Sequence, residues 1–236
     1  MQDRDIVYIL KADINAQELK YSLRSIETNF PHRFVWFIGG QPEGLTPDRR
    51  IRHKQTGSDK WGLIRSSMLK VLQHEELSPE FYLFNDDFFV MRPFTGDFIN
   101  YADRTLTERV EELRQTSHKW LTPYARTLKK AAEELKIMGC PEINYDVHLP
   151  MLFEKDKATK AIMSCSSPQM RSVYGNYTRS PYIMRDDVKV YDLVTVPEDA
   201  DFISTNDDTF NKGAVGEYIR GCFPHPSRFE KGDADV

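Results

Sequence analysis

The chain has 236 residues, of which 40% are hydrophobic and 29% are charged, and its formal net charge is -4. This length suits one large α/β domain, or one such domain with an insertion, and the composition is that of an ordinary soluble protein. The negative charge argues against a surface built for non-specific binding along nucleic acid, although local basic clusters could still bind phosphate.

Two further features bear on the cellular compartment. No apolar run approaches about 18 residues, the length that spans a bilayer, and Met1 to Asp5 lack the layout of a signal peptide. The cysteines are Cys140, Cys165 and Cys222, an odd number at wide spacing without a zinc-type pairing. We therefore expect a cytoplasmic protein with reduced cysteines and no membrane span.

The chain begins with the pattern of a strand, a helix and a second strand. Residues 5–10, which are apolar after Asp5, and residues 34–38 are short runs without alternation, which is typical of strands buried on both faces. Between them, Asn15 with Glu18 three residues later resembles a capping box, and apolar residues then recur at helical spacing. This order predicts a right-handed βαβ unit with parallel strands.

The same alternation continues through the next part of the chain. Residues 49–54 indicate a short, basic strand, residues 59–73 a helix with an apolar inner face, and residues 81–84 a further buried strand. Together these elements predict an α/β fold with a mostly parallel sheet flanked by helices.

Asn85, Asp86 and Asp87 directly follow the apolar run at residues 81–84, and a further apolar run begins at Phe88. Adjacent carboxylates between apolar runs are costly to desolvate unless they accept hydrogen bonds or hold a cation. At the carboxyl end of a buried strand they would supply hard oxygen ligands for Mg²⁺ or Mn²⁺, where open α/β sheets bind ligands. The alternative is that Asn85 and Asp86 form the turn of a β-hairpin.

Residues 102–140 have a different texture and predict a helical insertion in a single domain that spans residues 1–236. Two helical patterns follow each other, broken at Thr122-Pro123, where Thr is a fair N-cap and Pro suits the first helical position. We interpret this insertion as a lid of low chemical content, and the alternative is that it holds the acceptor.

Three polar features in the second half could carry chemistry or could be structural. His148 lies between Asp146 and Pro150 in an extended stretch, and a lone histidine is more often structural than catalytic. Arg171 and Arg179 could clamp phosphate, but two surface arginines are the more frequent case. Residues 206–208, Asn-Asp-Asp, repeat the earlier tripeptide and would also suit a helix N-cap.

In this order, these pieces resemble the Stealth family of sugar-phosphate transferases. That family includes bacterial capsular polysaccharide phosphotransferases and is related to the lysosomal-enzyme N-acetylglucosamine-1-phosphotransferase. The resembling runs are residues 18–26, 36–42, 77–89, 148–150, 170–172 and 205–208. The family's first region usually reads Tyr-Thr-Trp-Val-Asp-Gly, of which only Tyr8 and Asp13 have counterparts here.

The resemblance implies a Rossmann-like, GT-A-like transferase with a nucleotide-sugar donor, a UDP-sugar in the first place, and Mg²⁺ or Mn²⁺. It would move a sugar 1-phosphate to the hydroxyl of a glycan or other acceptor, in polysaccharide or glycoconjugate synthesis. The metal ligands that we expect are Asp86, Asp87 and Asp208. The catalytic residues that we expect are His148, Asp207, Arg171 and Asp87. The substrate-binding residues that we expect are Tyr8, Asp13, Arg24, Asn85, Asn206 and Arg179.

Other outcomes stay open at the level of the sequence. Attack on the anomeric carbon would transfer the sugar itself, either to a polysaccharide or to a hydroxylated nucleic-acid base. The basic run at residues 49–54 could hold a nucleic-acid backbone, although the net charge weighs mildly against nucleic acid as a partner. A non-catalytic nucleotide-sugar-binding module is a further alternative.

Overall fold

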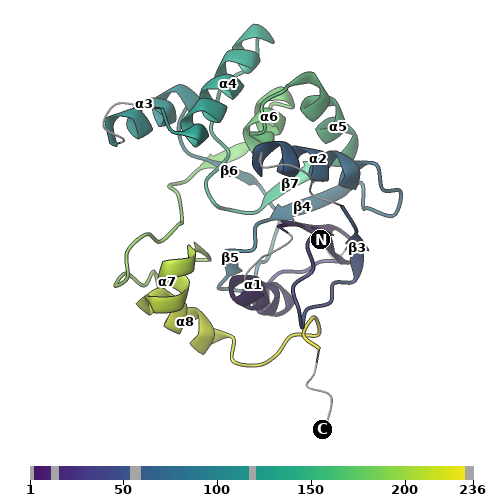
Figure 1. The fold of residues 1–236 in the computed structure, drawn as a ribbon, viewed down its shortest axis with the longest axis vertical. Coiled ribbons are helices and arrows are strands. Elements are labelled where there is room, and N and C mark those ends of the chain that lie inside the picture. Colours follow the sequence, from purple (N-terminus) through teal and green to yellow (C-terminus); the bar gives the residue numbers. More distant parts are fainter. Residues whose placement is uncertain (1–2, 12–15, 54–59, 117–120, 232–236) are drawn as a thin grey trace.

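The computed structural model describes residues 3–11, 16–53, 60–116 and 121–231. Five strands form its central sheet in the order β3-β2-β1-β4-β7 (Figure 1). They are β1 (Asp5–Leu10), β2 (Val35–Gly39), β3 (Arg49–Ile51), β4 (Glu80–Phe84) and β7 (Met151–Glu154). The first four run parallel, and β7 pairs antiparallel with β4. The predicted fold class, a Rossmann-like and mostly parallel sheet flanked by helices, is confirmed.

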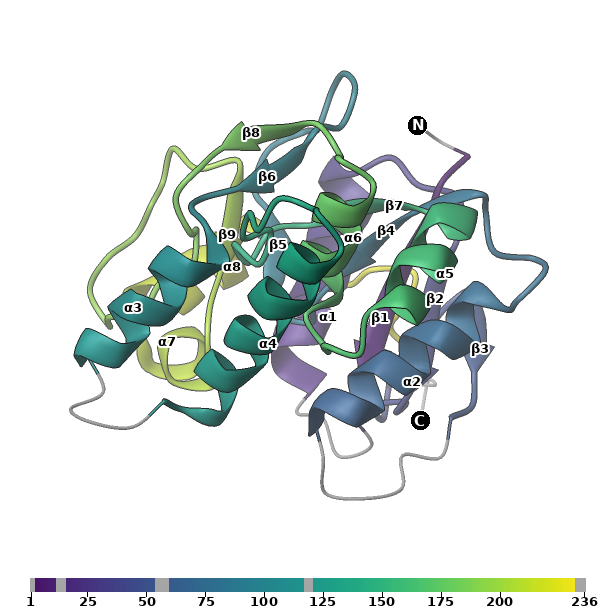
Figure 2. The same cartoon turned by 90° about the horizontal axis from the view of Figure 1, so that it is seen from above.

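Helices cover both faces of this sheet, as Figures 1 and 2 show. On one face, α1 (Ala16–Asn29) buries its apolar side chains against alternate residues of β1 and β4, including Tyr8 and Phe84. The opposite face is covered by α2 (Lys60–Leu72), α5 (Lys155–Ser164) and α6 (Met170–Tyr177). Because both of their faces are buried, β1, β2 and β4 are mainly continuous apolar runs, which is why they were recognisable in the sequence.

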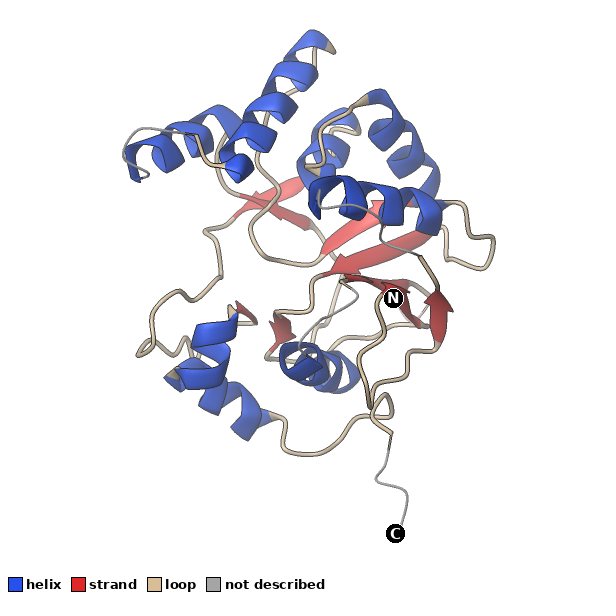
Figure 3. Cartoon of the chain, in the orientation of Figure 1, coloured by secondary structure: helices blue, strands red, loops and turns tan. Residues whose placement is uncertain are grey.

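The predicted insertion contains two helices, α3 (Leu106–Thr116) and α4 (Pro123–Ile137), which pack on each other. Leucine and alanine side chains form their shared core, and α4 also contacts α6. Thr122 caps α4 by accepting a hydrogen bond from the Ala125 N–H, with Pro123 at the start of the helix, as predicted. Figure 3 shows this pair of helices at one end of the molecule.

Two small sheets and a helical pair complete the fold. β5 (Phe88–Val90) pairs antiparallel with β9 (Phe202–Ser204), and β6 (Asn100–Ala102) pairs parallel with β8 (Tyr182–Met184). The helical pair is α7 (Asp207–Lys212) and α8 (Ala214–Cys222). Because β4 and β5 pair with different strands, Asn85 and Asp86 are not the turn of a hairpin, and that alternative is wrong.

A buried ion pair fixes the C-terminal segment to the first helix. Arg24 donates from Nε and Nη2 to the two carboxylate oxygens of Glu230, at 2.7 Å each, and from Nη1 to the carbonyl oxygens of Phe223 and Pro224. Burial alone would raise the pKa of Glu230, but hydrogen bonds from Arg24, Ser227 and Lys20 lower it to about 2. None of the described helices combines the length and apolar character needed to cross a membrane.

Candidate functional site

The candidate site lies where β4 ends, next to the end of β1. We call Asn85, Asp86 and Asp87 the β4 tip. Here the chain leaves the central sheet before it enters β5. The strand order reverses direction between β1 and β4, which is the place where open α/β sheets bind ligands.

Asp87 is anchored by residues from the second half of the chain. Its Oδ2 accepts a hydrogen bond from Lys189 Nζ at 2.8 Å and one from Ser204 Oγ at 3.1 Å. The Thr205 N–H also donates to the Asp87 backbone carbonyl, at 3.3 Å. The β4 tip is therefore held against β9 by both main-chain and side-chain contacts.

Asp86 and Glu18 add two further carboxyl groups beside Asp87. Burial and the neighbouring charge of Asp87 raise the pKa of Asp86 to about 6, with Lys11 and Lys189 opposing the shift. Glu18 lies in the first turn of α1 and accepts a hydrogen bond from Thr205 Oγ1 at 2.6 Å. Burial raises the pKa of Glu18 to about 7, and Asp86 and Asp87 add to this effect. Three acidic groups that disfavour each other's charge would gain from a bound cation.

Asp86→Asn is expected to raise the free energy of unfolding of the metal-free protein by about 1–3 kcal/mol at about pH 7.5. The folded pKa of about 6 exceeds the ordinary value of 3.8, so ionisation destabilises the native state above pH 6. This penalty disappears as the pH falls toward the ordinary value, and the two proteins should converge there. Urea unfolding in EDTA, at about pH 7.5 and about pH 4.5, measures the difference. Equal stability at the higher pH would contradict the expectation.

Arg171 joins this site from α6, and its guanidinium contacts the β4 tip through Asn85. Its Nη2 donates to Asn85 Oδ1 at 3.0 Å and to the Leu83 carbonyl at 3.2 Å, and its Nη1 lies 3.7 Å from Asp146 Oδ1. The Arg171 Nε is buried and has no hydrogen-bond partner among the residues that the structure describes. Burial lowers the pKa of Arg171, while Asp146 and Asp87 favour its charged form. A fixed cation therefore stands beside the acidic groups.

His148 forms a pair with Asp187 on the other side of Phe88. Its Nδ1 is 2.9 Å from both carboxylate oxygens of Asp187. Asp187 Oδ1 also accepts a hydrogen bond from the Lys189 N–H at 3.0 Å. Burial alone would raise the pKa of Asp187, but the hydrogen bond and charge of His148 lower it. The centroid of the Phe88 ring lies 6.5 Å from that of His148 and 5.3 Å from Arg171 Cζ, so Phe88 contacts both side chains.

The backbone at His148 supports a functional interpretation. Its φ is 50°, in the left-handed region that non-glycine residues rarely adopt. Such strain is of order 1–3 kcal/mol and clusters at functional sites. With Nδ1 donating to Asp187, the neutral ring would present Nε2 as its proton-accepting atom.

Several expected site residues thus come together, namely Asn85, Asp86, Asp87, His148 and Arg171. The sequence did not identify Glu18, Asp187 or Lys189 as site residues. Asp187 and Lys189 belong to a charged, irregular segment that resembles an ordinary solvated surface. Only its alignment beside β9, where Lys189 bridges to Ser204, brings them to the site.

Other expected site residues lie elsewhere or have structural contacts. Tyr8 is fully buried and its hydroxyl is 2.9 Å from Ser22 Oγ, so it supports the core beneath Asp86 and cannot touch a substrate. Arg24 uses its guanidinium to hold the C-terminal segment, as described above. Arg179 is exposed, with φ 51°, just after the end of α6. Asp13 lies outside the described residues.

The second Asn-Asp-Asp tripeptide forms the start of α7, which confirms the alternative that it caps a helix. Asn206 accepts hydrogen bonds from the N–H groups of Asp208 and Thr209, both at 3.0 Å. Asp207 and Asp208 are exposed, and Asp208 pairs with Lys212 at 2.7 Å. Of the two carboxylates, Asp207 is close enough to Glu18 to contribute to its raised pKa.

A divalent cation fits part of the expected ligand set. The described residues contain no group of three His, Cys, Asp or Glu side chains placed to hold a metal ion. Asp208 therefore does not join Asp86 and Asp87 as a third ligand, which corrects that expectation. Mg²⁺ commonly uses one or two carboxylates and completes its shell with water and substrate phosphates. Asp86 and Asp87 fit such a partial site.

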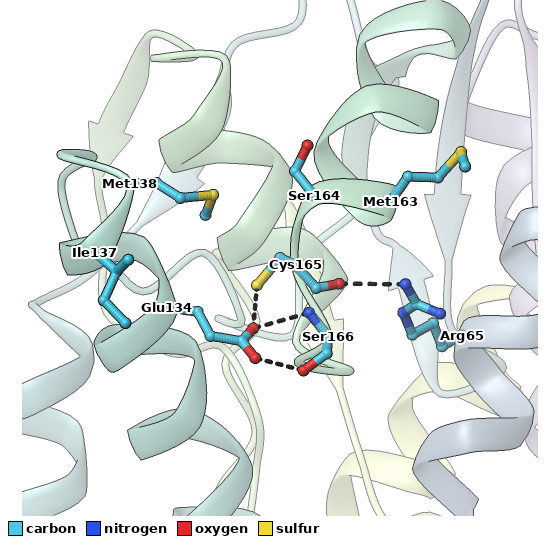
Figure 4. A pocket seen from close by; sticks show the side chains of 8 residues that line it. All are labelled: Arg65, Glu134, Ile137, Met138, Met163, Ser164, Cys165 and Ser166. Carbon is cyan, nitrogen blue, oxygen red and sulfur yellow. Dashed lines mark hydrogen bonds between the residues drawn. The ribbon is translucent and has the colours of Figure 1, made fainter.

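A cavity of about 310 Å³ lies between α4 and α5, with Arg65 of α2 at its edge (Figure 4). Glu134 accepts hydrogen bonds from Cys165 Sγ at 2.6 Å and from the N–H groups of Ser166 and Ser167 at 2.9 Å. Burial, with the Glu134 hydrogen bond, raises the pKa of the Cys165 thiol to about 12. This thiol is therefore unreactive, and the cavity surrounds a contact that joins two helices.

Comparison with known proteins adds little to this geometry. No protein-family model matches the chain, and no curated protein matches it either. One similar solved structure is the galactosyltransferase LgtC in complex with donor and acceptor sugar analogues. It shares 11% sequence identity at a TM-score of 0.39, with 95% of this chain and 98% of that chain covered. Because none of these comparisons identifies a family for the chain, the resemblance to the Stealth family stays a prediction.

Proposed function

We propose that this chain is a metal-dependent transferase that moves a sugar 1-phosphate from a nucleotide-sugar to an acceptor hydroxyl. One observation carries the proposal: Asp86 and Asp87 share the β4 tip with the buried guanidinium of Arg171, which lies 3.0 Å from Asn85 Oδ1. A carboxylate pair suits a divalent cation, and a guanidinium suits phosphate oxygens. A diphosphate with its metal ion satisfies both halves of such a site.

The cation would be held by Asp86 and Asp87, and when bound it would neutralise charge on the diphosphate. Arg171 would donate hydrogen bonds to the phosphate that leaves. Asn85 orients Arg171 through the bond described above. Lys189 holds Asp87 in place through its hydrogen bond to Oδ2 and adds a second positive charge beside the carboxylates.

His148 is the proposed general base, oriented by Asp187. Its Nε2 would take the proton of the acceptor hydroxyl as that oxygen attacks the phosphorus bonded to the sugar oxygen. The bond between this phosphorus and the bridging oxygen breaks, and the nucleoside monophosphate leaves with the electron pair. Asp207, exposed at the start of α7, is the second candidate for this base, with Asn206 positioned by its capping bonds. The products are a sugar phosphodiester and a nucleoside monophosphate.

The released nucleotide tests this proposal directly. The protein is incubated with a panel of UDP-, GDP-, ADP- and CMP-sugars, hydroxyl acceptors and Mg²⁺ or Mn²⁺, and the nucleotides are separated by chromatography. We expect a nucleoside monophosphate from a diphosphate donor, and loss of the signal in EDTA. A nucleoside diphosphate would instead indicate transfer of the sugar through its anomeric carbon. Binding without release of either nucleotide would indicate a non-catalytic binding module.

The acceptor panel includes a glycan and a duplex containing a hydroxymethylated base. Arg50 in β3 and Arg52 just after it are exposed, and both belong to the basic run at residues 49–54 that could hold a nucleic-acid backbone. The glycan is the expected acceptor. Transfer to the duplex alone, weakened by Arg50→Ala and Arg52→Ala, would replace the glycan by nucleic acid in this proposal.

A further inference from the structure

An aromatic pair joins two helices next to the site, and neither of its residues has a role in the proposed reaction. Trp61 lies in the first turn of α2 and Tyr124 in the first turn of α4. Their ring centroids are 5.9 Å apart and the ring planes differ by 26°, so the rings are stacked. Both side chains are half-buried, so part of each stays accessible to a ligand.

The pair is connected to the phosphate-binding side of the site through one carboxylate. The Tyr124 hydroxyl donates to Asp146 Oδ2 at 3.1 Å, and Asp146 Oδ1 lies 3.7 Å from Arg171 Nη1. Burial raises the pKa of Tyr124, and the charge of Asp146 raises it further, so the phenol remains a donor. The aromatic rings are therefore one side chain away from the guanidinium that would hold the diphosphate.

The aromatic pair stands at the rim of the small core between α3 and α4. The core between α3 and α4 consists of leucine and alanine side chains, among them Leu128, Ala131 and Leu135, which are buried deeply. Tyr124, at the start of α4, packs against the rim of that core, and its ring stacks on Trp61 from α2. Aromatic faces placed beside a cationic phosphate site are suited to a nucleobase, because every base has a flat π-face.

We propose that Trp61 and Tyr124 bind the nucleobase of the donor by stacking, while Arg171 binds its diphosphate. This inference rests on the proposed function for the place of the diphosphate. It also gives the helical insertion a role, since α4 supplies one of the two rings and fixes it through Asp146. The insertion would then bind the donor, in contrast to a lid of low chemical content.

Isothermal titration with UDP, ADP and inorganic pyrophosphate, each with Mg²⁺, tests the inference without requiring turnover. We expect the nucleoside diphosphates to bind the wild-type protein about 5- to 150-fold more tightly than pyrophosphate, because stacking one base contributes about 1–3 kcal/mol. Trp61→Ala should remove this advantage and leave pyrophosphate binding unchanged. Trp61→Phe, which keeps an aromatic face, should retain most of it.

Tyr177→Ala is the matched control, because Tyr177 is an exposed aromatic residue at the end of α6, and it should bind like the wild type. Thermal unfolding of each variant separates a loss of binding from a loss of fold. The inference is overturned if Trp61→Ala binds UDP and ADP as the folded wild type does, or if no nucleotide binds more tightly than pyrophosphate. Nucleotide binding that depends on Trp61 without any sugar-phosphate transfer would uphold the inference and reject the proposed function.

Discussion

Replacing Arg171 by Met is expected to lower kcat/KM for nucleotide-sugar turnover by at least about 100-fold. The variant removes the only described cation that contacts both Asn85 and Asp146, at 3.0 and 3.7 Å, and it leaves a diphosphate without its guanidinium partner. Arg171→Lys keeps a charge but not the planar fork, so it should recover only part of the rate. Steady-state nucleotide release measures both variants.

Arg179→Ala is the matched control for this prediction. Arg179 lies eight residues further along, is exposed, and makes no described side-chain contact with the β4 tip, so turnover should stay at the wild-type level. Unfolding curves show whether Arg171→Met remains folded, because removal of a buried ion-pair partner also destabilises. A folded Arg171→Met protein with an unchanged rate would remove Arg171 from the reaction.

Asp5→Ala is expected to lower the free energy of unfolding by about 3–5 kcal/mol. Asp5 is fully buried at the start of β1, so it lies at the amino ends of the parallel strands, whereas the β4 tip lies at their carboxyl ends. It accepts two hydrogen bonds from Arg33 at 2.8 Å, one from Trp36 Nε1 at 2.9 Å and one from the Ser78 N–H at 3.0 Å. Its removal leaves buried donors without partners.

Glu80→Ala provides the comparison, because Glu80 also lies at the start of a strand and pairs with Arg4, but its side chain is 44% exposed. Such a surface pair contributes about 0–1 kcal/mol, so its loss should be small. Urea unfolding of both variants, with the wild type alongside, gives the two values. Similar small losses in both would show that Asp5 does not join β1, β2 and the segment before β4 as we infer.

The sheet and its helices could be predicted because the sequence pattern reports burial directly. Residues 6–10, 34–38 and 81–84 are apolar without alternation, and a strand covered on both faces requires that pattern. The helix predicted over residues 59–73 corresponds to α2, Lys60–Leu72, in the structure. The antiparallel direction of β7 could not be predicted, because strand direction depends on the path of the chain between strands.

The site was predictable only where its residues follow a strand. Asp86 and Asp87 stand out because two carboxylates between apolar runs are unusual. Glu18 instead resembled a helix-capping residue, and its burial beside Asp87 depends on the position of Thr205 in space. Asp208 was expected as a metal ligand from the resemblance to the Stealth family, yet its exposed side chain forms an ion pair with Lys212 of the same helix.

The most direct test of the central claim is the turnover of nucleotide-sugar by Asp86→Asn at saturating donor and Mg²⁺. The account predicts a protein that is at least as stable as the wild type. Its rate of nucleotide release should be lower by at least about 100-fold. A folded Asp86→Asn protein that releases nucleotide at nearly the wild-type rate would contradict it.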